Sequence, residues 1–208
     1  EEPPVEEPPV EEPPVEEPPV EEPGLDAPGF SSMGEPALLT TTAGHGTHTG
    51  WMQLYTSSTI NGGNYYLSST VTTNSNITVS GNVTLCLNSN TLNIGQNTTF
   101  TVSSGATLTI CDCGSGGAIT GTESRINLNV ISVTGSTLNL ESGTISGTTT
   151  GSGSLISVTD GELNVTGGTI SLNHTGKGTQ LGVQAVELSN STGSFTGGVL
   201  LCCVNARA

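Results

Sequence analysis

A 25-residue step in the apolar positions from residue 131 onward is the feature that most constrains how this chain can fold. The step links Ile131, Ile156 and Leu181; Val133, Val158 and Val183; Leu138, Leu163 and Leu188; Gly143, Gly168 and Gly193; and Ile145, Ile170 and Phe195. Earlier in the chain it links Ile77 to Val102, Val83 to Leu108, Leu85 to Ile110, and Ile94 to Ile119. An insertion of five residues separates the two blocks, because Leu108 and Leu138 are 30 residues apart. A fixed period of this size is typical of repeat proteins, in which each unit buries its apolar face only by stacking on its neighbours.

Within each repeat, short apolar runs alternate with a period of two residues, as in Ile131-Ser132-Val133 and Leu138-Asn139-Leu140. Such runs, broken by Gly, Ser and Asn, indicate short strands joined by turns. The sequence therefore predicts an all-β fold, a right-handed parallel β-helix with about 25 residues per rung and about five rungs. Its apolar residues would stack inward at roughly 4.8 Å. A leucine-rich repeat requires a helical return that is missing here, and a β-sandwich would not keep a constant spacing.

The prolines divide the chain sharply. Residues 1–20 are four copies of Glu-Glu-Pro-Pro-Val, and all 11 prolines lie at or before Pro36. Proline excludes helix, and the repeated acidic charges repel, so residues 1–36 are predicted to form a disordered, acidic polyproline II spacer. The four repeats and the partial fifth copy that follows them would reach about 70 Å as a polyproline II rod. We expect a linker and N-terminal cap over 37–66, the parallel β-helix over 67–200, and an aberrant or truncated C-terminus over 201–208.

Charge excludes several classes of partner. Of the 18 acidic residues, 12 lie within residues 1–35, so the formal charge of −15 belongs mostly to the spacer. The remainder has six acids against Arg125, Lys177 and Arg207. No basic stripe is present to neutralise phosphates, and no apolar run is long enough to span a membrane, so we predict neither a nucleic-acid partner nor a transmembrane segment. A body rich in Gly, Ser, Thr and Asn favours an extracellular or cell-surface location.

Four segments carry a family resemblance: Gly62–Leu67, Val83–Asn88, Leu108–Cys113 and Gly143–Gly147. They resemble secreted or surface β-helix proteins of gut bacteria, which are similar in fold to the pectin-lyase-like group, and the resemblance covers about residues 45–200. It implies a non-catalytic surface module, either a structural stalk or an adhesin-like scaffold that contacts glycans, host proteins or the cell wall. The alternative is a fragment of a polysaccharide lyase or glycoside hydrolase of that fold.

No complete catalytic constellation is found. Gly44-His45-Gly46-Thr47-His48 resembles the histidine motif of subtilisin-type proteases, but the aspartate and serine motifs of that triad are missing. As metal ligands, His45 and His48 have no evident third partner, so we predict no metal, cofactor or catalytic residue.

Two carboxylates share the 25-residue step. Glu162 and Glu187 are predicted to stack outward at roughly 5 Å. That spacing would suit a retaining glycosidase or, with Asp160, a calcium site. No further acid or base joins them in register, so we interpret them as a solvated acidic pair.

Two cysteines share the same step. Cys86 and Cys111 should both face outward, because Leu85 and Ile110 face inward. Neighbours on adjacent rungs fall within disulfide range, so either a rung-to-rung bridge or two stacked free thiols is expected. Cys113 adds a Cys-x-Cys pair, but the five cysteines do not supply a complete zinc set. Cys202 and Cys203 are assigned no role.

Candidate ligand-binding residues are the clustered aromatics Trp51, Tyr55, Tyr65 and Tyr66. Their rings could stack on sugars, or they could cap the open end of the β-helix; we favour the cap. Thr109, Asn139 and Asn164 also predict a flat polar surface that could contact glycans.

Overall fold

The computed structural model describes residues 42–43, 46–55, 58–176 and 182–204. All of them belong to one compact unit, Pro36–Ala208. The predicted spacer at 1–36, His45 and residues 205–208 lie outside the described residues.

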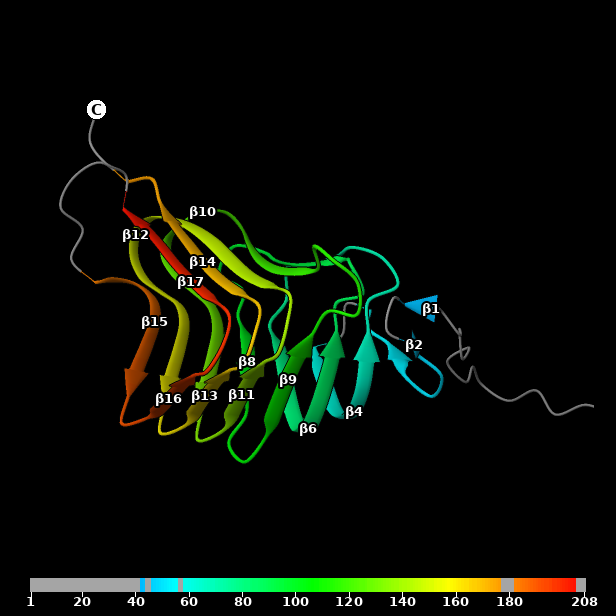
Figure 1. The fold of residues 1–208 in the computed structure, drawn as a ribbon. Coiled ribbons are helices and arrows are strands. Elements are labelled where there is room, and N and C mark those ends of the chain that lie inside the picture. Colours follow the sequence, from blue (N-terminus) through cyan, green and yellow to red (C-terminus); the bar gives the residue numbers. More distant parts are fainter. Residues whose placement is uncertain (1–41, 44–45, 56–57, 177–181, 205–208) are drawn as a thin grey trace, which may run out of the picture. The chain divides into compact units, whose positions relative to one another are not determined.

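The described residues form strands and turns and contain no helix, so the prediction of an all-β fold is confirmed (Figure 1). Fifteen strands make one sheet in which every pair is parallel, and β1 and β2 form a separate antiparallel hairpin. In the described part of the chain, nothing has the length and apolarity of a helix that crosses a membrane. The strands are β1 Thr42–Ala43, β2 Gly46–Thr47, β3 Met52–Gln53, β4 Thr59–Tyr66, β5 Val71–Thr73, β6 Ile77–Cys86, β7 Thr91–Ile94, β8 Phe100–Val102, β9 Thr107–Cys111, β10 Ala118–Thr134, β11 Thr137–Leu140, β12 Thr144–Thr159, β13 Glu162–Val165, β14 Thr169–His174, β15 Val183–Ser189, β16 Thr192–Phe195 and β17 Val199–Val204.

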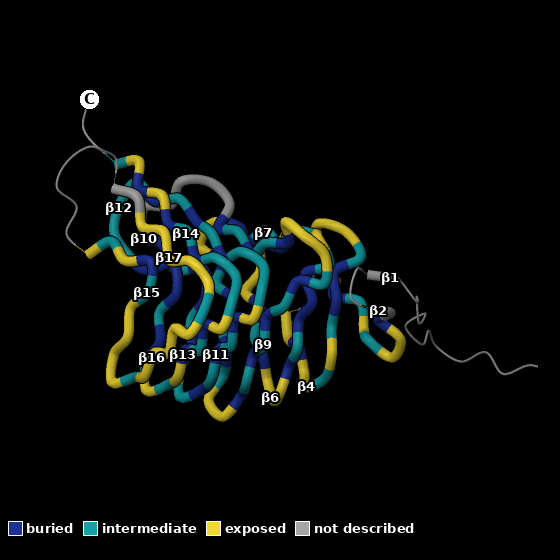
Figure 2. Tube along the Cα trace, in the orientation of Figure 1, coloured by how far each residue is buried: buried dark blue, intermediate teal, exposed yellow. Residues whose placement is uncertain are grey.

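Apolar side chains stack in rows across the sheet and form its core. One row joins Val83, Leu108, Leu138 and Leu163, which pair directly on β6, β9, β11 and β13 and are buried. Polar residues alternate with them and face outward, as the period of two predicts. Figure 2 shows the alternation as dark blue and teal segments along the strands. The order of partners in this row agrees with the spacing in the sequence, including the insertion between Leu108 and Leu138.

Elsewhere the regular step predicts the wrong partners. Ile77 pairs with Phe100 rather than Val102, and Ile119 pairs with Leu92 rather than Ile94. These errors arise because the loops at the corners differ in length. Gly121 and Ile131 both lie on β10 and are ten residues apart. Their partners, Ile94 on β7 and Phe100 on β8, are only six residues apart.

The last step along the chain is also longer than the repeat predicts. Ile156 pairs with Val186, Leu163 with Gly193, and Ile170 with Leu200. The cause is a longer connection between β14 and β15. Thr149 and Gly153 are four residues apart, whereas their partners His174 and Val183 are nine apart. Leu163 and Leu188 are 25 residues apart in the sequence, but they do not pair with each other in the structure.

The parallel pairing extends beyond the expected bounds of 67–200. At the start, β3 and β4 already pair in parallel with each other, and β4 pairs with β6; at the end β17 continues to Val204, opposite His174. The last core-facing side chains of the sheet are partly exposed to solvent, because no further described strand packs over them. Leu188, Phe195 and Leu200 are 41, 48 and 51 % exposed, although they pair with the buried residues Val158, Val165 and Ile170.

Candidate functional site

A group of three thiols and one imidazole lies on the outer surface of β4, β6 and β9. We call His48, Cys86, Cys111 and Cys113 the sulfur–imidazole cluster. Cys86 ends β6 and pairs with Cys111 at the end of β9. Their neighbours Leu85 and Ile110 belong to the core, so both thiols face outward, as the alternation predicts.

The segment after β2 covers these thiols. The backbone N–H of Trp51 donates to the carbonyl of His48 at 3.0 Å, and this turn lays the His48 ring over the sheet. The ring stacks on Tyr66, with centroids 4.7 Å apart and planes 12° apart, and meets Trp51 edge-on at 5.0 Å. Cys86 is therefore fully buried although it points away from the core, and His48 is only 2 % exposed.

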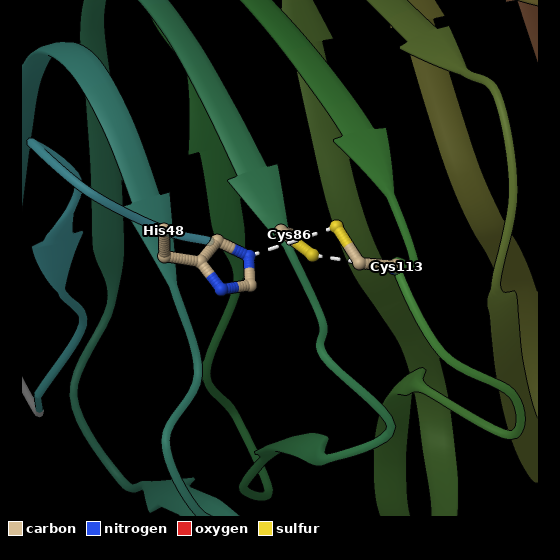
Figure 3. Close-up of side chains that lie close together, drawn as sticks. All are labelled: His48, Cys86 and Cys113. Atoms are coloured by element: carbon tan, nitrogen blue, oxygen red, sulfur yellow. Dashed lines mark hydrogen bonds between the residues drawn. The ribbon is translucent and has the colours of Figure 1, made fainter. Parts of the chain in front are cut away.

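His48 presents Nε2 to the sulfur atoms (Figure 3). Nε2 lies 3.6 Å from Sγ of Cys113, and the backbone N–H of Cys113 donates to Sγ of Cys86 at 3.3 Å. The potential ligand atoms of His48, Cys86 and Cys113 all lie within 4.8 Å of one another. The other ring nitrogen, Nδ1, is buried and has no hydrogen-bond partner among the residues that the structure describes.

Asp112 fixes the loop that carries Cys113. Its carboxylate is buried and accepts hydrogen bonds from the backbone N–H groups of Ser89 and Gly117, each at 2.8 Å. A Cβ at Gly117 would lie 2.6 Å from Cγ of Asp112, so only glycine fits beside this carboxylate. The Asp112 carboxylate therefore holds the turn that places the backbone N–H of Cys113 against Sγ of Cys86.

The three thiols differ in pKa: that of Cys86 is lowered, and those of Cys111 and Cys113 are raised. A hydrogen bond from Cys111 is the largest cause that lowers the pKa of Cys86 to about 5, with further contributions from Cys113 and His48. The pKa of Cys111 is raised, chiefly because its proton is held in that bond, and burial is the main cause that raises the pKa of Cys113 to about 12. The lowered pKa of Cys86 favours its thiolate form beside two thiols and an imidazole. Such a set offers soft sulfur ligands and one nitrogen ligand.

The sequence predicts this cluster only in part. The 25-residue step places Cys86 beside Cys111, and the structure confirms that they are neighbours on adjacent strands, but both thiols are free in the structure. The disulfide between them stays a prediction. The sequence indicates no further ligand for His48, whereas the structure brings Cys86 and Cys113 to its ring.

The predicted stacking of Glu162 on Glu187 is wrong. Glu162 pairs with Thr192 on β16, and Glu187 pairs with Ser157 on β12 and accepts a hydrogen bond from Oγ of Ser154 at 2.6 Å. The longer connection before β15 causes the error, because it lengthens the step along the chain and places the two carboxylates on different parts of the sheet.

The four candidate aromatics are not one exposed platform. Tyr66 is buried, and Trp51 is partly buried against His48. Tyr65 packs against the core and donates its hydroxyl to the carbonyl of Asn61 at 2.8 Å. Tyr55 is 62 % exposed, so among the four it alone offers most of its ring to solvent.

A polar face lies on β6, β9, β11, β13 and β16, which run side by side (Figure 1). Its central column pairs Thr84, Thr109, Asn139, Asn164 and Ser194 in register. Nδ2 of Asn139 donates to Oγ1 of Thr109 at 3.1 Å, and Nδ2 of Asn164 donates to Oδ1 of Asn139 at 3.1 Å. These bonds hold the amides in one line and leave further donor and acceptor positions directed outward.

A shallow groove borders this polar face. It has a volume of about 380 Å³, and it lies over the turns that precede β9, β11, β13 and β16. Its lining includes Thr107, Thr137, Glu162 and Thr192, which form the adjacent outward column of the same strands. The polar face and the groove therefore make one continuous surface of hydroxyl, amide and carboxylate groups.

Comparisons with protein-family models, with curated proteins and with solved structures give no match to this chain.

Proposed function

We propose that this chain is a non-catalytic module of an extracellular or cell-surface protein and that its polar face binds glycans. Its strands would wind as a right-handed parallel β-helix of about five rungs, as in the pectin-lyase-like proteins that the sequence resembles. The parallel pairing throughout the large sheet is consistent with that architecture.

The hydrogen-bonded column of Thr109, Asn139 and Asn164 is the observation that carries the proposal. Strand spacing repeats its amides and hydroxyls at roughly 4.8 Å, so a sugar chain could meet similar donors and acceptors on successive strands. The side chains are already held by one another. Less side-chain entropy is then lost on binding than for freely rotating groups.

The alternative, a lyase or hydrolase fragment, gains no catalytic pair from the described residues. Glu162 and Glu187 were the candidate stacked carboxylates in this chain, and the strand register separates them. The groove beside the polar face includes Asp160 and Glu162, but Asp160 accepts a hydrogen bond from Nδ2 of Asn190, its neighbour in the lining. No observation places a general acid and a nucleophile across one sugar position, so binding without cleavage is the function we favour.

A glycan array probed with the full chain tests the proposal. We expect saturable binding to a limited group of glycans without release of shortened products. Replacing Asn139 or Asn164 by Ala should weaken binding by about 2- to 13-fold each, because each change removes a hydrogen-bonding group worth about 0.5–1.5 kcal/mol.

Thr120→Ala and Ser146→Ala are the matched controls. Thr120 and Ser146 form an outward hydrogen-bonded pair at 3.1 Å on β10 and β12, away from the polar face. Their replacement should leave glycan affinity unchanged. An array without any bound glycan, or equal losses in the control variants, would overturn the assignment of the polar face.

A further inference from the structure

We propose that His48, Cys86 and Cys113 bind one zinc ion through Nε2 and two thiolates, and that Cys111 supplies the fourth ligand. Its ligands are not residues of the polar face, although Cys86 and Cys111 follow Thr84 and Thr109 on the same outer side of β6 and β9. The proposal does not depend on glycan binding. Nothing in the 25-residue repeat requires it, because His48 lies on a segment outside the large sheet.

The separation of the ligand atoms fits a tetrahedral zinc centre. With Zn–S near 2.3 Å and Zn–N near 2.0–2.1 Å, tetrahedral angles place sulfur and nitrogen about 3.5 Å apart and two sulfurs about 3.8 Å apart. Nε2 of His48 lies 3.6 Å from Sγ of Cys113, and no pair among the three ligand atoms exceeds 4.8 Å. A contraction of at most about 1.3 Å in any one of these distances would therefore complete the coordination geometry.

Cys111 is the natural fourth ligand. It pairs with Cys86 on the adjacent strand, precedes Cys113 by two residues and faces the same outer side of the sheet. One imidazole and three thiolates make a Cys₃His set, which is one of the closed sets of structural zinc sites. Iron–sulfur clusters usually take four thiolates, and magnesium or calcium prefer oxygen ligands, so these donors favour zinc.

The protein holds the ligands in place before the ion arrives. Stacking on Tyr66 and the edge of Trp51 orients the His48 ring, and the Asp112 turn places Cys113. On binding, Zn²⁺ takes the place of the thiol protons, and each proton passes to the solvent as its Zn–S bond forms.

The site would tie the segment before β3 to the large sheet. His48 is the ligand that comes from this segment, whereas the three cysteines belong to β6, β9 and the loop after β9. Zinc would therefore act as a cross-link over the outer surface of β4, β6 and β9, and it would raise the midpoint of thermal unfolding, since the ion binds the assembled site better than the unfolded chain.

The test uses the full chain with Cys202 and Cys203 replaced by Ser, so that the exposed Cys202 thiol cannot bind metal. Reduced, metal-free protein is titrated with Zn²⁺ in competition with a chromogenic chelator, and with Co²⁺ as a spectroscopic probe. We expect one equivalent of Zn²⁺, a tetrahedral Co²⁺ spectrum with thiolate charge-transfer bands, and a higher melting temperature with zinc.

His48→Ala and Cys113→Ser should each weaken zinc binding by at least about 100-fold, more than the loss of a group that only orients a ligand. His174→Ala is the matched control, because His174 is also buried but lies on β14, and it should bind zinc as the parent does. Far-UV circular dichroism checks that each variant folds. His48→Ala is the decisive variant, since its side chain is outside the strands.

Three results would overturn the zinc site: no stoichiometric uptake, an octahedral Co²⁺ spectrum, or unchanged affinity in folded His48→Ala. Isolation of a Cys86–Cys111 disulfide that resists mild reductant and prevents uptake would also overturn it, in favour of the covalent bridge. Cys111→Ser should lower the charge-transfer intensity by about one third, one of three thiolates. An unchanged spectrum would remove Cys111 from the ligand set.

Discussion

At the scale of single residues, Asp112 is the buried polar group on which the sulfur–imidazole cluster most depends. Replacing it by Ala leaves the backbone N–H groups of Ser89 and Gly117 without their acceptor. We expect the free energy of unfolding of the metal-free, reduced protein to fall by about 1–3 kcal/mol. Urea denaturation followed by circular dichroism measures it.

Glu162→Ala is the control for Asp112→Ala. Glu162 is an exposed carboxylate on β13, and its replacement should change the free energy of unfolding by less than about 0.5 kcal/mol. Equal losses in the two variants would show that the hydrogen bonds to Asp112 do not stabilise the fold.

Residue-level prediction from the sequence succeeded where the strand register decides position. The alternation around Leu85 and Ile110 placed Cys86 and Cys111 side by side, and the structure confirms it. It failed for His48, because the contact of this residue with the thiols depends on how a turn at Trp51 lays one segment over another. Neither the spacing nor the composition of the sequence carries that information.

At the scale of elements, Gly153 controls the path of the long strand β12. Its φ of +109° is unfavourable for other residues, and a Cβ there would lie 2.3 Å from the carbonyl oxygen of Leu128 on β10. Gly153→Ala should therefore lower the free energy of unfolding by at least ~2 kcal/mol, because strain and backbone clash combine. Thermal unfolding of the variant would reveal it as a lower midpoint.

Gly105→Ala separates the two causes. Gly105 also has a positive φ, +76°, but a Cβ there would meet no heavy atom within 4 Å. This variant should lose only the conformational part, about 1–2 kcal/mol. If both variants melt at the same temperature, the close approach of β10 and β12 does not constrain Gly153.

The pairing of elements was predictable only where corners have constant length. The regular step correctly joined Leu138 to Leu163, and the longer step across the insertion joined Leu108 to Leu138. The regular step misplaced the partner of Leu163 on the next strand, because five additional residues lie in the connection between β14 and β15. A repeat in sequence therefore measures distance along the chain, whereas register depends on the path at each corner.

At the scale of the whole molecule, stability should decline toward β16 and β17. In the described structure each pairs with a strand on one side only, whereas β11 pairs on both sides with β9 and β13. The inward residues Phe195 and Leu200 are about half exposed, so opening this end exposes little additional apolar surface. Native-state hydrogen exchange should show at least about tenfold lower protection for amides of β16 and β17 than for β11. Uniform protection across these strands would contradict the expectation.

The near-constant offset between paired strands also determines how the sheet would respond to a mechanical load. Successive strands from β9 to β16 pair at nearly equal intervals along the chain, and each inner strand pairs with the strands on either side of it. Tension along the polypeptide would release one such interval of chain at a time, and each release would lengthen the chain by about 80–110 Å. The molecule would extend in nearly equal increments and dissipate work at each one, as an extensible tether does, instead of rupturing in a single event.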